Sequence, residues 1–300
     1  MLMLANVWYS IHNSQRAFTF TMESESQFDG HSALVTGAAS GIGRLVAEML
    51  AMRGARVSLF DQNKEGLEAV RSAFTATGWT VAVTSGDASN EHDAAKAVQT
   101  AVDAFGGLDM LVNAAGIIIR KTLLETTPEE WRRVIDVDLN GYFYMLRAAI
   151  PEIRKAGGGS IVQISSVCAN IGLGYPSYTA AKGGVSSLTR QLAGELAPYR
   201  IRINSVSPGP TETAINLDTM GDAAIKASIV ANTPSGRTGQ PVDIARAILF
   251  LLAPASDYIN GTDLVVDGGI SSKIHFGAAG ESFLSYHEPA NAAAAHHAAS

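Results

Sequence analysis

A phenol and an ammonium group lie four positions apart in this chain, at Tyr178 and Lys182. On a helix, that spacing places the two side chains on one face, one turn from each other. A free tyrosine has a pKa of about 10 and is a poor base at neutral pH, but a nearby cation favours the phenolate and lowers that value. The pair therefore predicts general acid/base catalysis by Tyr178, assisted by Lys182.

A serine hydroxyl precedes this pair by twelve positions. Ser166 directly follows a β-rich run at residues 160–165. Loops at the carboxyl ends of parallel strands line the ligand crevice of α/β sheets. The sequence therefore predicts Ser166 in the same site as Tyr178 and Lys182.

A glycine-rich loop lies between the first β-rich run and the first helical pattern. Its sequence is Thr36-Gly37-Ala38-Ala39-Ser40-Gly41-Ile42-Gly43, and an apolar stripe with helical periodicity follows at once. Glycines in this context let the backbone turn tightly and approach a pyrophosphate, whose charge suits a helix N-terminus. The loop predicts a dinucleotide site, to which we assign Gly37, Ser40, Gly41, Ile42 and Gly43.

An acidic residue, Asp61, ends the second β-rich run. Its carboxylate is placed to accept hydrogen bonds from the adenosine ribose hydroxyls of a dinucleotide and to repel a 2′-phosphate. The residues that follow it are Gln62 and Asn63 rather than lysine or arginine, although Arg44 lies nearby on the helix. This pattern predicts NAD as the cofactor, with NADP less favoured.

The elements that position these residues alternate between short β-rich runs and helical patterns. The predicted strands cover residues 33–36, 56–61, 80–85, 109–113, 160–165, 202–206 and 263–266. Seven such strands with helices between them predict a single α/β domain whose doubly wound parallel sheet has helices on both faces. We expect an N-terminal extension at residues 1–28, a catalytic domain at 29–270 and a C-terminal tail at 271–300.

Composition narrows the class of protein. The 300 residues are 47% hydrophobic and 17% charged, with a net charge of -6 and scattered basic residues. This balance predicts a globular protein with a small-molecule partner and gives no footprint for nucleic acid or an anionic membrane. The chain has no apolar run of the ~20 residues that span a bilayer and one cysteine, Cys168, so we expect a cytoplasmic protein. The terminal pair His296 and His297 has no grouped acidic or cysteine ligand, and we predict no metal site.

Taken together, these motifs resemble the short-chain dehydrogenase/reductase family, in its common branch of about 250 residues, over positions 30–269. That resemblance implies a single-domain Rossmann fold. It also assigns further cofactor-binding residues that follow the third, fourth and sixth strands, namely Asp87, Ala88, Asn113, Ala114, Gly116, Pro208, Gly209, Thr211 and Thr213. The segment Val266-Asp267-Gly268-Gly269 resembles the family's closing strand.

The resemblance also implies roles for the catalytic residues. Tyr178 would exchange a proton with the substrate oxygen, Ser166 would hydrogen-bond to that oxygen, and Lys182 would bind the nicotinamide ribose while lowering the pKa of Tyr178. The family's usual asparagine is replaced by Asp138, which we assign as a fourth catalytic residue. Where the family uses the backbone carbonyl at this position, Asp138 still supplies it, and the sequence predicts that Asp138→Asn changes turnover by less than about tenfold.

Assembly is a further expectation from the resemblance, which implies a homotetramer. Two long helical patterns, at residues 128–155 and 177–199, carry more apolar positions than one sheet face covers. We expect these helices to form the dimer surfaces.

The expected activity is NAD-dependent interconversion of a secondary alcohol and a ketone or aldehyde. The alternative is a catalytically silent NAD-binding sensor or scaffold, because its cofactor loop would look the same. The chain has no Gly-x-Ser-x-Gly elbow, which disfavours a hydrolase, and the four-residue spacing of Tyr178 and Lys182 is narrower than in the family's enoyl reductases. Alcohols, sugars, steroids and ketoacyl thioesters all remain open as substrates. The predicted substrate wall consists of Ile117, Ile118, Ile119, Ile171, Leu173, Tyr175 and residues 214–233.

Overall fold

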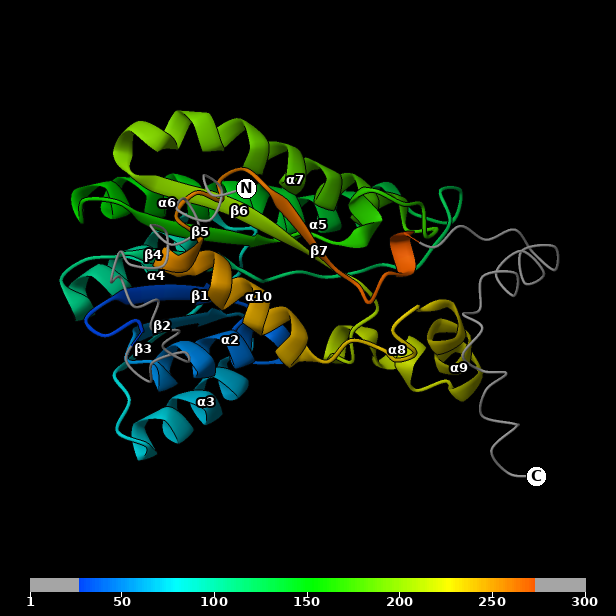
Figure 1. Ribbon diagram of the computed structural model, residues 1–300, viewed down its shortest axis with the longest axis horizontal. Coiled ribbons are helices and arrows are strands. Elements are labelled where there is room, and N and C mark those ends of the chain that lie inside the picture. The colour runs from blue at the N-terminus through cyan, green and yellow to red at the C-terminus, as the bar shows by residue number, and fades with distance from the viewer. Residues whose placement is uncertain (1–26, 273–300) are drawn as a thin grey trace, which may run out of the picture.

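Seven parallel strands form one sheet at the centre of the computed structural model, which describes residues 27–272 (Figure 1). The strands are β1 (Ser32–Thr36), β2 (Arg56–Asp61), β3 (Val81–Ser85), β4 (Met110–Asn113), β5 (Gly159–Ile164), β6 (Ile201–Pro208) and β7 (Asp263–Val266). Their order in the sheet is β3-β2-β1-β4-β5-β6-β7, so the direction of winding reverses between β1 and β4. Ligands of open α/β sheets bind outside the carboxyl ends of the strands at such a reversal. The predicted doubly wound, seven-stranded parallel sheet is confirmed.

The strands are apolar along most of their length because helices cover both faces of the sheet. All five residues of β1 are buried, and its side chains alternate between the two faces. Ala33 and Val35 belong to one hydrophobic core, and Leu34 belongs to the other. β6 extends beyond its predicted end because Ser207 and Pro208 continue the pairing with β7.

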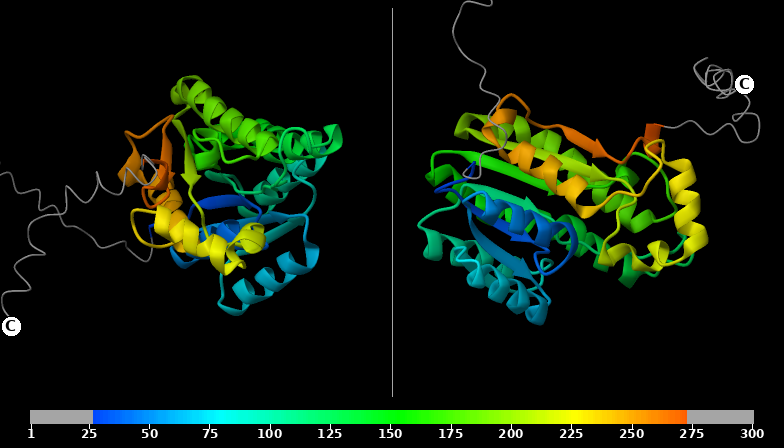
Figure 2. Two further views of the ribbon diagram at one scale, coloured as in Figure 1. Left: turned by 90° about the vertical axis from the view of Figure 1, so that its right-hand side faces the viewer. Right: turned by 60° about the horizontal axis from the view of Figure 1, so that its bottom comes forward.

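Two groups of helices form the outer layers. The helices are α2 (Gly41–Met52), α3 (Lys64–Ala76), α4 (Glu91–Phe105), α5 (Pro128–Ile135), α6 (Gly141–Lys155), α7 (Pro176–Leu196), α8 (Leu217–Met220), α9 (Ala223–Asn232) and α10 (Pro241–Leu252). The helices α2, α3 and α10 pack into the first core, and α4, α6 and α7 pack into the second. Figure 2 shows the sheet between these two layers.

The helix predicted at residues 128–155 is helical throughout but consists of two α-helices separated by a wider turn. It begins with a capping box between Thr127 and Glu130, and α5 and α6 are joined by a π-helical turn, Asp136–Asn140. Such wide turns occur frequently at functional sites. Here the turn contains Asp138, whose side chain is completely buried.

The short helices α8 and α9 lie apart from the two layers. In Figures 1 and 2 they stand beyond the end of the sheet to which the strands point. Asp222 caps α9 through Ala224 N and Ile225 N, but no residue of α9 is fully buried. This segment covers the carboxyl ends of the strands, where the cavity described below opens.

The boundary predicted at residue 28 needs a correction. Phe28 is 2% exposed and belongs to the first core, and its N–H donates to the carbonyl of Arg53. The aromatic ring is therefore part of the folded domain because it fills space beside the end of α2. The rest of the predicted extension, residues 1–26, and the tail residues 273–300 with His296 and His297 lie outside the described residues. In the part of the chain that the structure describes, no helix is long and apolar enough to cross a membrane.

Candidate active site

A large cavity opens at the carboxyl ends of the strands. Its volume is about 1050 Å³, and loops that follow β1, β2, β4, β5 and β6 line it together with α8 and α9. Every predicted catalytic and cofactor-binding residue except Asn113 lines this cavity, and in the predicted substrate wall Ile119 does not. We call the part formed by the loops after β1 and β2 and by Asp87 and Ala88 the glycine-loop end. The part formed by residues 117–120, 167–175 and 214–232 is the α9 end, and Ser166, Tyr178 and Lys182 are contributed by elements between the two.

Asn113 is the exception because it is still part of β4. Its pairing with Gln163 of β5 keeps it within the sheet, where it is 1% exposed. Neither the nitrogen nor the oxygen of its side-chain amide has a hydrogen-bond partner. The predicted cofactor contact of Asn113 is therefore not supported by its position in this structure.

The glycine-rich loop is constrained by backbone crowding. A Cβ atom at Gly43 would lie 2.4 Å from the carbonyl oxygen of Gly37, and Gly37 itself adopts a φ of +67°. Both conditions require glycine. The first turn of α2 contains no acidic residue, and Ser40 makes no side-chain cap to it. The helix N-terminus is therefore left open toward the cavity, as an anionic pyrophosphate requires.

Thr36 holds this loop against the loop that follows β4. Its hydroxyl oxygen accepts hydrogen bonds from Ala114 N at 2.9 Å and Ala115 N at 3.0 Å. Thr36, the first residue of the glycine-rich run, thus has a structural role that its position in the sequence did not indicate. The two loops that flank the winding reversal thus form one unit.

Asp61 lies at the end of β2, as predicted, and lines the glycine-loop end. One carboxylate oxygen accepts from Ala39 N at 3.1 Å and the other accepts from Asn63 N at 2.9 Å. Each oxygen keeps a lone pair for a further donor. Arg44 is exposed and is not among the residues that line the cavity. The donor and acceptor chemistry here fits a ribose diol.

Asp87 is held by Ser89 of the same loop and by Arg133 of α5. One carboxylate oxygen accepts from the Ser89 hydroxyl at 2.7 Å, and the other lies 3.1 Å from the Arg133 guanidinium. Burial acts to raise the pKa of Asp87, but the hydrogen bonds from Ser89 and Arg133 hold it below its ordinary value. The sequence did not predict Arg133, because this contact joins α5 to the loop after β3.

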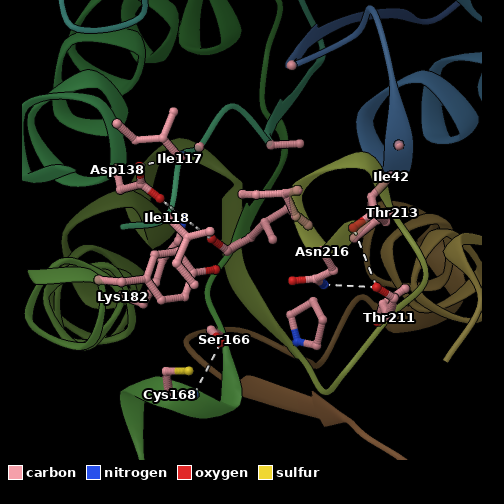
Figure 3. A pocket seen from close by; sticks show the side chains of 18 of the residues that line it. Ile42, Ile117, Ile118, Asp138, Ser166, Cys168, Lys182, Thr211, Thr213 and Asn216 are labelled. Carbon is pink, nitrogen blue, oxygen red and sulfur yellow. Dashed lines mark hydrogen bonds and ion pairs between the residues drawn. The ribbon is translucent and has the colours of Figure 1, made fainter. Parts of the chain in front are cut away.

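Ser166 caps the short 3-10 turn Val167–Ala169 that follows β5. Its Oγ accepts from Cys168 N at 3.1 Å, and the side chain is 7% exposed. Figure 3 shows Ser166 and Lys182 on one side of the cavity, with Thr211 and Thr213 on the other. Ser166 lines the cavity, so its hydroxyl is accessible to a ligand there.

A buried hydroxyl network anchors the catalytic helix. Ser165 Oγ donates to the carbonyl of Lys182 at 3.0 Å and lies 2.7 Å from Ser186 Oγ. Ser186 in turn donates to Asp263 of β7 at 3.0 Å. The network holds α7 against β5 and β7 and so fixes the heights of Tyr178 and Lys182 above the sheet.

The Lys182 ammonium is enclosed by three oxygen atoms. Nζ lies 3.1 Å from Asp138 Oδ2, donates to the Tyr142 hydroxyl at 3.1 Å and donates to the Ile164 carbonyl at 3.0 Å. The other oxygen of Asp138 accepts from Ile117 N at 2.8 Å. It is thus the carboxylate of Asp138 that contacts Lys182. Tyr142 is a second phenol at this site, and the sequence motifs did not indicate it.

The charges of this cluster set the protonation of its members. Burial acts to lower the pKa of Lys182, but its electrostatic interactions with Tyr142, Asp138 and Tyr178 raise it above its ordinary value, so the ammonium stays protonated. Burial raises the pKa of the Tyr178 phenol, and the Lys182 ammonium opposes that shift without reversing it. Lys182 thus lowers the pKa of Tyr178, as predicted. In the protein without cofactor, however, burial outweighs Lys182, and the pKa of Tyr178 is raised above its ordinary value. The structure gives Nζ 5.6 Å from the centroid of the Tyr178 ring.

Comparison with known proteins defines the family. A family model described as Enoyl-(Acyl carrier protein) reductase matches residues 37–271. A cyclohexanol dehydrogenase from Acinetobacter sp. (strain SE19) is 39% identical over 250 residues, which are 83% of this chain and 98% of that protein. The chain belongs to the short-chain dehydrogenase/reductase family and is an oxidoreductase.

Two further relatives show the range of this family. An L-rhamnose 1-dehydrogenase (NAD(P)(+)) from Azotobacter vinelandii is 36% identical over 80% of this chain and 96% of that protein. The crystal structure of a gluconate 5-dehydrogenase from Burkholderia cenocepacia J2315 in complex with NADP and tartrate is 33% identical, with a TM-score of 0.80. The match covers 84% of this chain and 99% of that one. Family membership implies a nicotinamide cofactor, and the open helix N-terminus, the glycine cradle and Asp61 fit one.

Proposed function

We propose that this protein interconverts a secondary alcohol and a ketone or aldehyde with NAD as the preferred cofactor and Tyr178 as the general acid/base. The observation that carries the proposal is the convergence of Ser166, Tyr178 and Lys182 on the same cavity as the glycine loop. The relatives named above act on cyclohexanol, rhamnose and gluconate according to their names, and each of these molecules carries a CH–OH group. Alcohol oxidation is therefore a better match than reduction of a carbon–carbon double bond, despite the description of the family model.

The residues of this chain divide the work on the reacting oxygen. Ser166 donates its hydroxyl hydrogen to that oxygen, and Tyr178 takes the alcohol proton in oxidation or returns it in reduction. Lys182, kept protonated by Asp138 and Tyr142, stabilises the phenolate form of Tyr178. When bound, the nicotinamide accepts the hydride from the alcohol carbon or supplies it to the carbonyl carbon.

The alternative function is a catalytically silent NAD-binding sensor or scaffold. Such a protein would need the glycine-loop end but not a hydroxyl, a phenol and an ammonium placed in the same cavity. Turnover separates the two functions. A sensor would bind NADH and yet reduce or oxidise no member of a broad panel of ketones and secondary alcohols.

Replacement of Tyr178 tests the mechanism. Because general acid/base catalysis contributes at least about 100-fold in rate, Tyr178→Phe is expected to lower kcat by at least that factor while NADH still binds. The control is Tyr258→Phe, because Tyr258 is 99% exposed. Turnover of Tyr178→Phe near that of the control would remove Tyr178 from this role.

Cofactor choice has its own test. The Asp61 carboxylate repels a 2′-phosphate, and the residues directly after it are Gln62 and Asn63, not one of the cations that line the cavity. We expect kcat/KM for NAD to exceed that for NADP by at least about tenfold. Asp61→Asn keeps an acceptor for Ala39 N but removes the charge, and it should narrow the ratio. A ratio near one in the unmodified protein contradicts the preference.

Assembly and location complete the proposal. We propose a homotetramer in which α5, α6 and α7 form a dimer surface, because Trp131 and Phe143 are 37% and 45% exposed on the first two of these helices. We place it in the cytoplasm on its single cysteine. Light scattering at micromolar concentration should return a tetramer mass, and a monomer mass would contradict the assembly.

A further inference from the structure

The α9 end of the cavity combines an apolar wall with one cation. The apolar side chains there are Ile118, Ile171, Leu173, Ile215, Ile225 and Ile229. Arg120 lies on the loop after β4 and lines the same part of the cavity. An apolar wall suits the carbon skeleton of a substrate. A guanidinium in that wall is suited to a charged group on the same substrate.

The partners of Arg120 are all uncharged. Nη2 donates to the Ile215 carbonyl at 3.0 Å and to Asn216 Oδ1 at 2.7 Å, and Cζ lies 5.8 Å from the centroid of the Tyr175 ring. Within residues 27–272, Arg120 forms no ion pair, and its buried Nε has no hydrogen-bond partner. A guanidinium offers five N–H donors in a planar fork that matches a carboxylate. Most of that donor capacity is unused here.

Asn216 holds the guanidinium in place rather than competing with a ligand. Its amide nitrogen donates to the Thr211 carbonyl at 2.8 Å, while its amide oxygen accepts from Arg120. Figure 3 shows Asn216 joined to Thr211 on the side of the cavity away from Lys182 and Asp138. The guanidinium is therefore oriented by a side chain that is itself fixed at both ends.

The other two cations that line the cavity are neutralised. Lys182 Nζ lies 3.1 Å from Asp138, and Arg133 lies 3.1 Å from Asp87. The carboxylates among the lining residues are those two and Asp61, and none of the three belongs to the α9 end. The positive charge of Arg120 is therefore left without a counterion in the cavity.

The charge of Arg120 is felt at Cys168, two residues from Ser166. Burial raises the pKa of the Cys168 thiol, and the hydrogen bond with Ser166 and, less strongly, the Arg120 charge oppose that shift. Cys168 N is the donor that orients Ser166. A ligand that contacts Ser166 is thus within the range over which Arg120 acts.

We propose that Arg120 binds a carboxylate of the substrate, so that the preferred substrates are hydroxy acids and their keto acids with an otherwise apolar body. This inference rests on the proposed function and adds the substrate class to it. In the oxidation, the alcohol carbon loses a hydride to the cofactor and the alcohol oxygen loses a proton to Tyr178, while the carboxylate is unchanged. Arg120 acts on binding and position and is not itself a catalytic residue.

Matched substrates test the proposal without relying on absolute rates. We would measure kcat and KM with NAD for 4-hydroxycyclohexanecarboxylate and its primary amide, which share the reacting alcohol and differ in charge. Because a desolvated, charge-assisted pair favours the acid, its kcat/KM should exceed that of the amide by at least about tenfold, mainly through KM. The pair gluconate and glucitol repeats the comparison on a polar carbon chain. Because the wall of the α9 end is apolar, we expect kcat/KM for both of these substrates to be lower than for the cyclohexane pair.

Two variants assign the preference to Arg120. Arg120→Met keeps most of the length without the charge, and it should bring the ratio of acid to amide to within about twofold of one. Arg120→Lys keeps the charge without the fork and should restore part of the ratio. If Arg120 only tethers the loop at Ile215 and Asn216, both substrates lose rate alike and the ratio of the unmodified protein persists, which overturns the proposal.

Binding of unreactive ligands separates this proposal from the proposed function. In the presence of NADH, calorimetry should show that cyclohexanecarboxylate binds more tightly than cyclohexanecarboxamide and that Arg120→Met removes the difference. Equal binding of the two ligands, or turnover of cyclohexanol with no preference for the acid, overturns the role of Arg120 and leaves the dehydrogenase function standing. Preferential binding of the carboxylate with no turnover of any alcohol supports the role of Arg120 and contradicts the dehydrogenase function.

Discussion

The glycine-loop end of the cavity is held by backbone contacts, whereas the α9 end is held by a few side chains on short elements. At the glycine-loop end, a Cβ on Gly43 would overlap the Gly37 carbonyl, and Thr36 ties two loops together through backbone N–H groups. At the α9 end, no residue of α9 is fully buried. The glycine-loop end is therefore rigid and fits one ligand shape. The α9 end is loosely packed and can move more easily.

The difference matches what each end must recognise. A pyrophosphate and a ribose present the same atoms whatever the alcohol is, so a rigid cradle costs no versatility. The α9 end meets the variable part of the reaction, and lids that close over substrates come from the least stable parts of a fold. Changes at the glycine-loop end should therefore abolish binding, and changes at the α9 end should only tune it.

The largest expected effect is at Gly43. Gly43→Ala places a methyl group 2.4 Å from the Gly37 carbonyl, so the loop must shift. We expect the Kd for NADH, measured by fluorescence titration, to rise by at least about 100-fold, or about 2.7 kcal/mol. The control is Gly194→Ala on the exposed face of α7, where an added Cβ meets no atom within 4 Å and should change stability by no more than about 1 kcal/mol. Normal NADH affinity in Gly43→Ala would show that the glycine-loop end is as adaptable as the α9 end.

The next effect is at Asp138, in the middle of the cavity. The carboxylate joins Ile117 N to the Lys182 ammonium. An asparagine must turn its NH₂ group toward one of these two donors, whichever way the amide is flipped. We therefore expect Asp138→Asn to lower kcat by more than about tenfold, beyond the limit predicted from the backbone carbonyl alone.

The pH profile identifies the cause of that loss. Asp138 helps to raise the pKa of Lys182, so its neutral replacement should lower that pKa. The high-pH limit of kcat/KM should then move to lower pH in Asp138→Asn, because Lys182 loses its proton sooner. A loss of kcat with an unchanged profile would mean that Asp138 acts only on packing.

The sequence predicted the glycine-loop end better than the α9 end for a physical reason. Glycine turns, strand ends and helix N-termini are local, so the run from Gly37 to Gly43 and the position of Asp61 already specify their geometry. The same holds for Ser166 at the end of β5 and for the turn that separates Tyr178 from Lys182. These residues all line the cavity.

Contacts between distant segments were not predictable from those patterns. Tyr142 reaches Lys182 across 40 positions, and Arg120 reaches Asn216 across 96. The position of a tyrosine or an arginine in the sequence does not indicate a partner that is so far away along the chain. Asn113 was assigned from a local motif, but its side chain stays within the sheet and does not line the cavity. Most of the named apolar residues of the predicted substrate wall line the cavity, but Ile119 does not, and the prediction did not include Arg120 among them.

A smaller effect is expected at Tyr142, which shares Lys182 with Asp138 but carries no charge at neutral pH. Its hydroxyl donates to the Ile164 carbonyl at 3.1 Å and accepts from Lys182. Tyr142→Phe keeps the ring, which lies 4.5 Å from Nζ, and removes only these two bonds. We expect thermal unfolding to show a loss of about 1–2 kcal/mol, with kcat/KM falling by less than in Asp138→Asn. A larger catalytic loss in Tyr142→Phe than in Asp138→Asn would make the phenol, and not the carboxylate, the main partner of Lys182.

The smallest effect is expected at Glu212, which tethers α9. Its carboxylate lies 2.8 Å from Lys226 Nζ of α9 and accepts from the Thr238 hydroxyl at 2.6 Å. Because this contact is exposed, Glu212→Gln should raise the substrate KM by only about two- to fivefold and leave the Kd for NADH unchanged. Lys226→Met should do the same, and the double variant should add little to either change if the ion pair is what acts. A change in NADH affinity would break the distinction between the two ends.

The pH dependence of the Glu212 tether follows from its pKa. The hydrogen bonds from Lys226, Thr238 and Gln240 lower that pKa from 4.5 to about 2. A carboxylate whose pKa is depressed in the folded protein contributes its stabilisation above the ordinary value and loses it as the pH falls through the depressed one. The ratio of KM between Glu212→Gln and the unmodified protein should therefore stay constant from about pH 8 to about pH 5, because Glu212 remains ionised throughout that range. A ratio that falls toward one already near pH 5 would show that α9 is released when Glu212 takes up a proton at its ordinary pKa, and that the tether is not formed in solution.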